Sequence, residues 1–263
     1  MPHEPLLDVS GLTVTFDGAP RPALDGVSFA LDAGRTLGVV GESGSGKSLT
    51  ALTILRLLPP TARLRAGTVR FQGRDLATLS DAEIRAVRGA GISLIFQEPM
   101  TALDPVMRVG DQIAEVLRIH GLARGAGAMA RAVDLLDAVR VPHAAQRARD
   151  YPHQLSGGLR QRVVIAMALA CRPALVIADE PTTALDVTVQ AEVLALLRDL
   201  REQYRLALLL ITHDFGVIAQ MADDVAVMHH GRIVEAGPVR TVLREPREAY
   251  TQALLAAVPG ARL

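Results

Sequence analysis

The sequence contains a single cysteine, Cys171. One cysteine excludes an internal disulfide and any zinc site made from several cysteines. Long apolar runs are also missing, because no stretch of about 18 residues lacks charged side chains, and we expect no membrane-spanning helix. The N-terminal segment has acidic residues and prolines instead of a basic segment leading into an apolar one, so we expect no signal peptide. The chain is therefore expected to be cytosolic.

An excess of charge of either sign is absent too, because 28 basic residues balance 28 acidic ones. A protein that binds nucleic acid usually has a basic excess or a basic stripe, so we expect no nucleic-acid partner. Lysine is almost absent. Lys47 is the sole lysine, and arginine occupies every other strongly basic position. The bias against lysine in this chain therefore has a single exception, position 47.

Two kinds of strand pattern are present in the 263 residues, of which 49% are hydrophobic. Alternating apolar residues predict an N-terminal antiparallel sheet. Its strands are expected at 6–16, 26–31 and 67–71. Continuous apolar runs, each followed by a helical pattern, predict βα units around a parallel sheet. These buried strands are expected at 37–40, 174–178 and 206–212.

Helical periodicity replaces the strands between residues 97 and 174. A glycine- and alanine-rich linker at 121–127 joins the first two of its helices. The helices are expected at 109–120, 128–139 and 158–170. Ser80 and Glu83 have the spacing of a capping box and predict a short helix before a strand at 92–96.

This order of elements predicts a helical subdomain inserted into an α/β core. We expect one domain over residues 1–263. Residues 1–97 and 174–263 would form the α/β core with its antiparallel β subdomain, and residues 98–173 the helical subdomain.

A phosphate-binding loop of the form G-x-x-x-x-G-K-[ST] lies between a predicted buried strand and an apolar helix expected at 49–58. Its glycines let successive N–H groups face a phosphate, and the helix N-terminus adds its positive dipole end. Lys47 would reach the β- and γ-phosphates, and the Ser48 hydroxyl would bind Mg²⁺. The loop residues are Gly41, Glu42, Ser43, Gly44, Ser45, Gly46, Lys47 and Ser48.

A chance match on a glycine-rich turn is the alternative interpretation of this loop. The lysine argues against it. Lysine is a compact point charge, whereas arginine is a wide planar fork that could not occupy the same cradle. A phosphate loop therefore explains why Lys47 alone remained lysine.

Two acidic residues, Asp179 and Glu180, end the predicted buried strand at 174–178. Carboxylates at the C-terminal end of such a strand lie beside the phosphate loop in an open α/β sheet. Asp179 suits the Mg²⁺ shell, directly or through water, and Glu180 suits orienting or deprotonating an attacking water. The alternative is that both acids cap the following helix.

The adjacent histidines His229 and His230 are candidate metal ligands. Neighbouring residues on a strand point to opposite faces, so they could not easily share one ion. We expect both to be structural.

Four strings together resemble the ABC ATPases, in the same order and spacing and over essentially the whole chain. They are the phosphate loop, Leu155-Ser-Gly-Gly158, the strand ending in Asp179-Glu180, and Ile211-Thr-His213. The resemblance implies the ABC ATPase fold, which has a P-loop NTPase core with a mixed or parallel sheet, an N-terminal antiparallel β subdomain and an inserted α-helical subdomain. It also implies an enzyme that hydrolyses ATP with Mg²⁺.

In that family two cassettes close head to tail, with ATP between one phosphate loop and the partner's Leu-Ser-Gly-Gly signature. The resemblance implies that Ser156, Gly157 and Gly158 contact the partner's γ-phosphate. A plain glycine N-cap is the alternative. This chain departs from the family at the fifth signature position, where Leu159 replaces the usual glutamine. That departure weakens the inference about hydrolysis at the partner's site.

The remaining site residues also follow from the resemblance. Gln97 matches the Q-loop glutamine, which touches Mg²⁺ and senses the membrane subunit. Asp186 belongs to Ala184-Leu-Asp186, which matches the D-loop. His213 matches the switch histidine, which would hydrogen-bond the γ-phosphate and act with Glu180 and Lys47 in catalysis. Phe16 matches the aromatic residue that stacks on adenine, with a plain core position as its alternative.

The branch of the family is indicated by residues 97–105 and 246–254, which resemble importers of dipeptides, oligopeptides and nickel. The resemblance implies two transmembrane permease subunits, an extracytoplasmic substrate-binding protein and a second ATPase subunit. That subunit is expected to be a related, distinct chain, with a homodimer as the alternative. The chain would lie peripherally on the cytoplasmic side of the inner membrane. An exporter ATPase and a non-transport ABC ATPase are the other readings.

Overall fold

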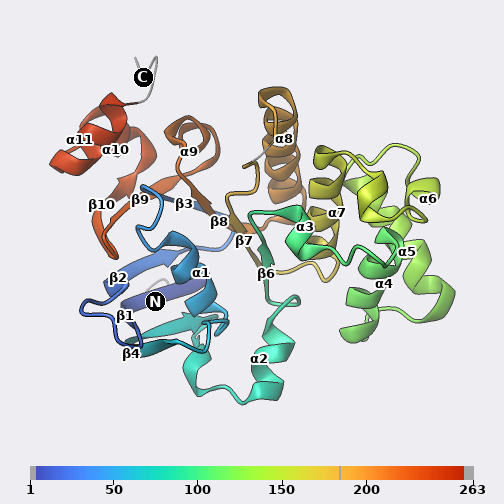
Figure 1. Ribbon diagram of the computed structural model, residues 1–263, viewed down its shortest axis with the longest axis horizontal. Helices are drawn as coiled ribbons and strands as arrows, with labels where there is room; N and C mark the ends of the chain where they lie inside the picture. Colours follow the sequence, from blue (N-terminus) through green and yellow to red (C-terminus); the bar gives the residue numbers. More distant parts are fainter. Residues whose placement is uncertain (1–3, 184, 258–263) are drawn as a thin grey trace. The chain divides into compact units, whose positions relative to one another are not determined.

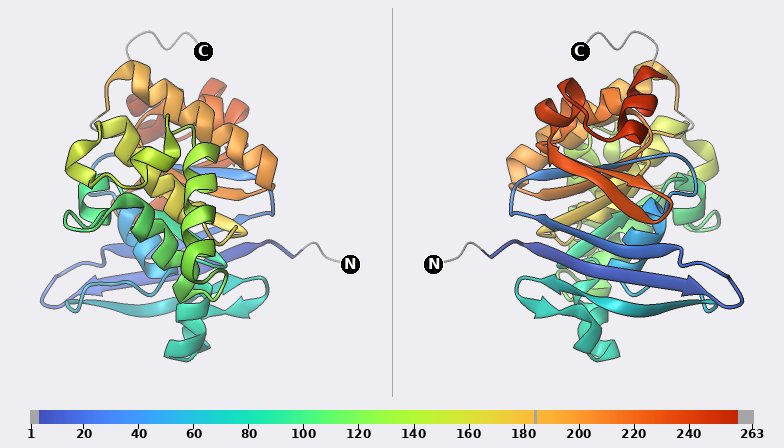
Figure 2. Two further views of the ribbon diagram at one scale, coloured as in Figure 1. Left: turned by 90° about the vertical axis from the view of Figure 1, so that its right-hand side faces the viewer. Right: turned by 90° about the vertical axis from the view of Figure 1, so that its left-hand side faces the viewer.

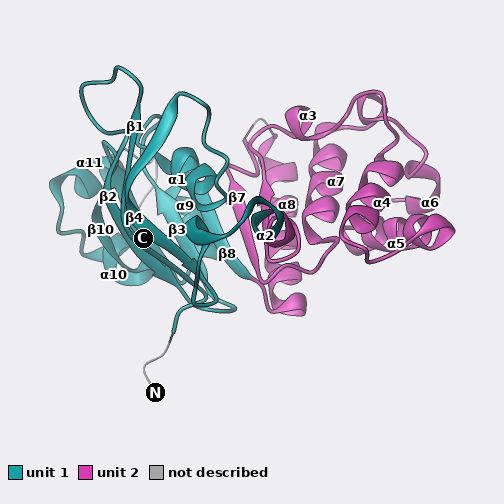
Figure 3. Cartoon of the chain, turned by 90° about the horizontal axis from the view of Figure 1, so that it is seen from below, with its two compact units in different colours: residues 1–84, 207–263 teal, residues 85–206 magenta. Residues whose placement is uncertain are grey.

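The computed structural model describes residues 4–183 and 185–257, which form two compact units (Figure 3). Unit 1 is drawn from Met1–Ile84 and Ala207–Leu263, and unit 2 from Arg85–Leu206. The segment 98–173, predicted as the helical subdomain, lies inside unit 2.

Unit 1 contains an antiparallel sheet with the strand order β2-β1-β4-β5. Along β1, buried residues alternate with more exposed ones, which is the pattern of a strand with one face on the core. Figure 2 shows the long strands β1 (blue) and β4 (teal) running side by side. The N-terminal antiparallel sheet is thus confirmed, although β4 begins before the predicted residue 67. The strands are β1 Leu7–Phe16, β2 Leu24–Leu31, β4 Ala62–Phe71 and β5 Arg74–Asp75.

A mixed set of strands in unit 1 carries the phosphate loop. β3 pairs in parallel with β8 and β9, and β9 pairs antiparallel with β10. Every residue of β3 and β8 is buried, which explains their continuous apolar sequences. The strands are β3 Thr36–Val40, β8 Ala207–Thr212, β9 Asp224–His229 and β10 Arg232–Pro238 (Figure 1).

Helix α9, Phe215–Met221, packs closely on β3. A Cβ atom on Gly38 would lie 2.4 Å from Ile218 Cδ1 and 3.3 Å from Ala222 Cβ. Glycine at this position therefore lets the helix approach the strand that leads into the phosphate loop. Unit 1 ends with α10, Val239–Arg244, and α11, Ala249–Ala256.

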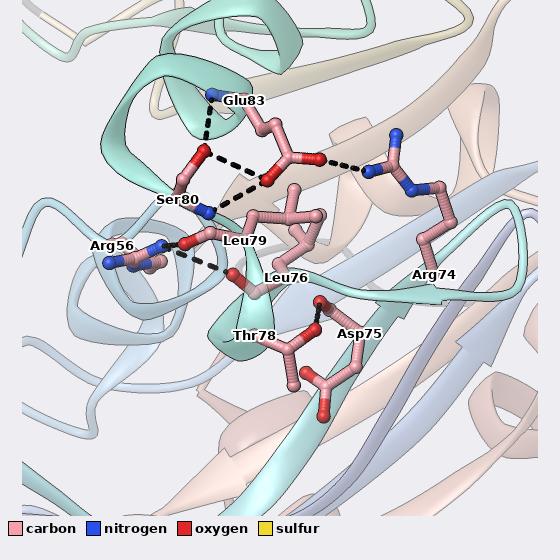
Figure 4. Close-up of polar contacts among 8 residues, drawn as sticks. All are labelled: Arg56, Arg74, Asp75, Leu76, Thr78, Leu79, Ser80 and Glu83. Carbon is pink, nitrogen blue, oxygen red and sulfur yellow. Dashed lines mark hydrogen bonds and ion pairs between the residues drawn. The ribbon is translucent and has the colours of Figure 1, made fainter.

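Helix α1, Lys47–Ile54, is shorter than the predicted 49–58 and begins two residues earlier. It ends because Arg56 has φ 54, and the N–H of Leu57 donates to Leu52 O at 2.8 Å. This is a Schellman cap with arginine at the left-handed position where glycine is usual. The Arg56 guanidinium then donates to Leu79 O at 2.6 Å and to Leu76 O at 3.4 Å (Figure 4).

The predicted capping box is confirmed in the segment that Arg56 contacts. Between η1, Leu76–Thr78, and α2, Asp81–Val87, the N–H of Glu83 donates to Ser80 Oγ at 3.3 Å. Glu83 Oε2 accepts from the Ser80 N–H at 2.9 Å and from its hydroxyl at 2.8 Å (Figure 4). These hydrogen bonds lower the pKa of Glu83, and the Arg74 guanidinium adds to the effect.

Unit 2 contains two parallel strands, β6 Ile92–Ile95 and β7 Leu175–Asp179, and a group of helices. No helix among residues 4–183 and 185–257 is long and apolar enough to cross a membrane. The longer helices match the predicted ones, with one correction. Helix α5 begins at Gly125, inside the predicted linker 121–127, and the N–H of Ala128 donates to Arg124 O at 3.3 Å. The helices are α3 Pro99–Ala102, α4 Val109–Ile119, α5 Gly125–Ala138, α6 Ala144–Arg147, η2 Pro152–Gln154, α7 Gly157–Leu169 and α8 Val187–Tyr204.

Candidate functional site

The phosphate loop leaves the end of β3 and turns into α1. Gly44 and Gly46 have φ 78 and φ 108, which glycine adopts without strain. Gly46 is the N-cap of α1 and has no side chain to cap the helix, so the start of α1 suits an anion from outside the helix.

The loop is packed tightly against β9 and the turn that follows β9. A Cβ on Gly41 would lie 2.1 Å from the carbonyl oxygen of Met228, and a Cβ on Gly46 would lie 2.9 Å from Met228 Cε. The N–H of Gly231, in the β9–β10 turn, donates to Ser45 O at 2.9 Å. Both glycines are therefore needed for the close approach, and Gly46 is needed for the curl of the loop as well.

Lys47 folds back over the loop that precedes it. Its side chain is buried, and its Nζ donates to Gly41 O at 2.8 Å and to Glu42 O at 2.9 Å. Within the same loop Ser45 Oγ is buried and has no hydrogen-bond partner. A buried hydroxyl without a partner is costly in a folded protein. An ammonium group, a partnerless hydroxyl and a helix N-terminus together fit a bound triphosphate.

Tyr250 on α11 also contacts the loop, and the sequence patterns gave it no role there. The N–H of Glu42 donates to Tyr250 Oη at 3.2 Å. Burial of the ring raises the pKa of Tyr250; the Glu42 N–H lowers it, and the Glu42 carboxylate raises it. The two residues are 208 positions apart, so no local spacing could have paired them.

The prediction that His229 and His230 point to opposite faces of one strand was wrong. His229 ends β9, but His230 lies beyond the strand with φ 47. Their rings therefore do not point to opposite faces, and the ring centroids lie 4.0 Å apart. The His229 ring also stacks on Tyr250, with centroids 3.7 Å apart and an interplanar angle of 15°. His229 thus supports Tyr250.

His213 and Phe16, the other two predicted site residues of unit 1, lie at strand ends. His213 follows β8 and is exposed, while the neighbouring Asp214 caps α9 by accepting from the N–H of Gly216 at 2.7 Å. Phe16 ends β1 and is half-buried. Neither side chain belongs to the closed core, so both are accessible to a ligand.

In unit 2 the structure brings Gln97 and Glu180 together. Gln97 Nε2 donates to Glu180 Oε2 at 3.1 Å, and Thr183 Oγ1 donates to the same oxygen at 2.8 Å. Glu180 has φ 45, a conformation that costs a non-glycine residue about 1–2 kcal/mol. Asp179 precedes it as the half-buried last residue of β7. The carboxylate of Glu180 is held by its neighbours while its backbone is strained, which is typical of a functional site.

The signature segment forms the start of α7. Ser156 is the N-cap and accepts from the N–H of Leu159 at 3.4 Å, so the N-cap reading and the anion-binding reading are compatible. Ser156 and Gly157 are exposed. A Cβ on Gly158 would lie 2.6 Å from Val189 Cγ1, so this glycine allows α7 to pack on α8.

Asp186 has a structural task in unit 2. It caps α8, and its Oδ1 accepts from the N–H of Val189 at 3.0 Å. Ala184, the first residue of the predicted D-loop, lies outside the described residues.

The predicted Mg²⁺ ligands are Ser48 in unit 1 and Gln97 and Asp179 in unit 2. Among residues 4–183 and 185–257 no group of three or more His, Cys, Asp or Glu side chains is placed to hold a metal ion. A hydroxyl, an amide and a carboxylate nevertheless supply the hard oxygen donors that Mg²⁺ prefers, together with phosphate oxygens. Each of the three side chains therefore offers a donor of a kind that fits Mg²⁺.

Comparison with known proteins adds independent findings. A family model described as ABC transporter matches residues 24–183. A putative peptide import ATP-binding protein of Brucella abortus is 50% identical over 97% of this chain and 77% of its own length. The oligopeptide transport ATP-binding protein OppD of Bacillus subtilis is 51% identical over 97% of this chain and 72% of its own. The glutathione import ATP-binding protein GsiA of Salmonella typhimurium is 50% identical over 98% of this chain and 44% of its own.

Solved structures give the same result for the fold. The ATP-binding cassette MJ0796, in a dimeric post-hydrolysis state bound to ADP and phosphate, matches with a TM-score of 0.78 and 28% identity. The match covers 89% of this chain and 99% of that one. The α/β cassette fold expected from the sequence is confirmed.

Proposed function

The chain belongs to the ABC transporter family, as the subunit that binds and hydrolyses ATP, and from this premise we propose that it drives the import of peptides. One observation carries the proposal: relatives about 50% identical over nearly the whole chain are named for the import of peptides, oligopeptides and glutathione. The same names favour peptides over nickel as the cargo and an importer over an exporter.

ATP binds, in this proposal, at the phosphate loop of unit 1. Lys47 contacts the β- and γ-phosphates from the position that its bonds to Gly41 O and Glu42 O give it. Ser45 Oγ, buried and partnerless, donates to the same group. Phe16 stacks on the adenine ring, and His213 hydrogen-bonds the γ-phosphate.

Hydrolysis depends on Glu180, which orients the attacking water and accepts its proton. Gln97 and Thr183 hold the carboxylate through Oε2, so its position is set before the nucleotide arrives. Ser48, Asp179 and Gln97 would hold Mg²⁺, which would supply positive charge to offset the negative charge of the phosphate oxygens.

A second cassette completes each site. Ser156, Gly157 and Gly158 bind the γ-phosphate held by the partner cassette, because the exposed start of α7 presents N–H groups and a positive dipole end. The partner is a related, distinct ATPase chain, with a homodimer as the alternative. Two transmembrane permeases and an extracytoplasmic binding protein complete the system, and the chain lies on the cytoplasmic face of the inner membrane.

Uptake in the source cells tests the cargo. Cells carrying Glu180→Gln in place of the wild-type chain are given labelled dipeptide, labelled oligopeptide or radioactive nickel. We expect peptide uptake to fall to background and nickel uptake to be unchanged. Loss of nickel uptake with normal peptide uptake would overturn the assignment.

A further inference from the structure

One peptide group of the phosphate loop is held at both ends. This peptide links Gly41 to Glu42. Its carbonyl oxygen, Gly41 O, accepts from Lys47 Nζ at 2.8 Å, and its N–H, on Glu42, donates to Tyr250 Oη at 3.2 Å. A peptide unit is planar, so fixing both its N–H and its carbonyl fixes the orientation of the plane. The plane thus connects the hydroxyl of Tyr250 to the ammonium of Lys47.

We propose that Tyr250 is a positioning residue for ATP binding, which holds Lys47 in place through the 41–42 peptide. The inference rests on the proposed role of Lys47 at the phosphates. It adds a residue from the C-terminal helix α11 to the nucleotide site. Tyr250 contacts the loop on the N–H side of the peptide, opposite the carbonyl that binds Lys47, so it acts on the lysine only indirectly.

The Tyr250 hydroxyl is itself preorganised. Its ring stacks on His229 with centroids 3.7 Å apart. The start of α11 is tied to β10, because Glu235 Oε1 accepts from the N–H of Arg247 at 2.8 Å and Oε2 from the N–H of Glu248 at 3.2 Å. A side chain held in this way loses little conformational freedom when it fixes the loop.

The chain of contacts predicts an effect on binding rather than on the chemical step. Without the Tyr250 hydroxyl, the 41–42 plane loses one of its two restraints, and Lys47 samples more positions. Each nucleotide that binds must then order the loop, which lowers affinity. The reacting water is oriented by Glu180 in unit 2, so turnover at saturating ATP stays nearly the same.

Tyr250→Phe is the direct test, since it removes the hydroxyl and keeps the ring on His229. On the full chain we expect ATP affinity to weaken about 3- to 10-fold, the range of one net hydrogen bond. In the assembled transporter we expect KM to rise by the same factor and kcat to stay within about twofold. Tyr204→Phe, the same change at the end of α8, is the matched control and should leave both parameters unchanged.

The sole lysine provides a second readout. Protein labelled with ¹⁵N-lysine gives signals from Lys47 alone. In nucleotide-free protein, Tyr250→Phe should shift or broaden these signals, and Tyr204→Phe should not. A purely structural loss would lower thermal stability without this selective change.

The outcomes separate this inference from the proposed function. If the wild-type chain binds no ATP, the assignment of the phosphate loop itself fails. If the wild-type chain binds ATP and Tyr250→Phe has the wild-type affinity and lysine signal, only the role of Tyr250 is overturned. A fall in kcat at unchanged KM would also overturn it.

Discussion

The side-chain amide of Gln97 donates to the carboxylate of Glu180 at 3.1 Å. These residues follow two parallel strands, β6 and β7, and are 83 positions apart in the chain. Glu180 keeps this contact in a left-handed backbone conformation, with φ 45. The pairing joins the residue that resembles the Q-loop glutamine to the proposed catalytic base, so movement of the segment after β6 would change the position of the carboxylate.

Glu180→Gln tests the proposed base. The amide has nearly the same shape but cannot take a proton from water, so we expect ATP to bind while hydrolysis slows roughly 10²- to 10⁴-fold. The closed dimer should then accumulate, which size-exclusion chromatography with ATP would detect. Glu115→Gln, on the exposed face of α4, is the matched control. Hydrolysis at the wild-type rate in Glu180→Gln would remove this residue from its role.

Lys47→Arg keeps the charge and changes its shape. The side chain is buried, and two carbonyl oxygens lie 2.8 and 2.9 Å from Nζ. A planar guanidinium cannot occupy this space without moving the loop. We expect an unchanged fold by circular dichroism and a loss of ATP turnover of roughly 10²-fold or more. Arg35→Lys, an exposed exchange on the same unit, should have no effect. Normal turnover in Lys47→Arg would contradict the assignment.

Local patterns were sufficient to predict several elements. The continuous apolar runs predicted β3, β7 and β8, because strands buried on both faces need no polar alternation. The Ser80–Glu83 spacing predicted the cap of α2, because that contact spans three residues. Features of this kind depend on neighbours in the chain.

Other features depend on residues that are far apart or on an unusual backbone conformation. Tyr250 reaches Glu42 from the other end of the sequence, and no periodicity encodes that contact. The predicted end of α1 was too late in the chain, because the left-handed position that ends the helix is occupied by arginine instead of the usual glycine. Arginines have a positive φ after or at the ends of several other helices as well. They are Arg140 (φ 60), Arg172 (φ 51) and Arg205 (φ 51).

Substitutions at Arg56 can separate the contributions of backbone conformation and side-chain hydrogen bonds to the stability of such a cap. Arg56→Ala and Arg56→Gly both lose the guanidinium bonds to Leu76 O and Leu79 O. Only glycine relieves the left-handed conformation at φ 54. We therefore expect Arg56→Gly to be more stable than Arg56→Ala by about 1 kcal/mol in urea unfolding. Equal stability of the two variants would show that the left-handed conformation is not retained.

We expect Glu235 to make a pH-dependent contribution to the free energy of unfolding. Burial raises its pKa, but the N–H groups of Arg247 and Glu248 lower it, and the net pKa lies below the ordinary value. A lowered folded-state pKa means that the carboxylate stabilises the fold fully above its unfolded-state pKa, about 4.3. This contribution is lost as the pH falls through the lower, folded-state pKa.

Glu235→Gln should therefore melt below wild type at pH 7, by about 2 °C for bonds that are largely exposed to solvent. The difference should shrink as the pH falls below about 4.3 and through the lower, folded-state pKa, because the wild-type carboxyl then becomes protonated as well. Glu245→Gln, an exposed change at the end of α10, controls for the loss of one negative charge. A melting difference that stays constant from pH 7 to the acid range would mean that ionised Glu235 does not hold the start of α11. Tyr250 would then need another anchor.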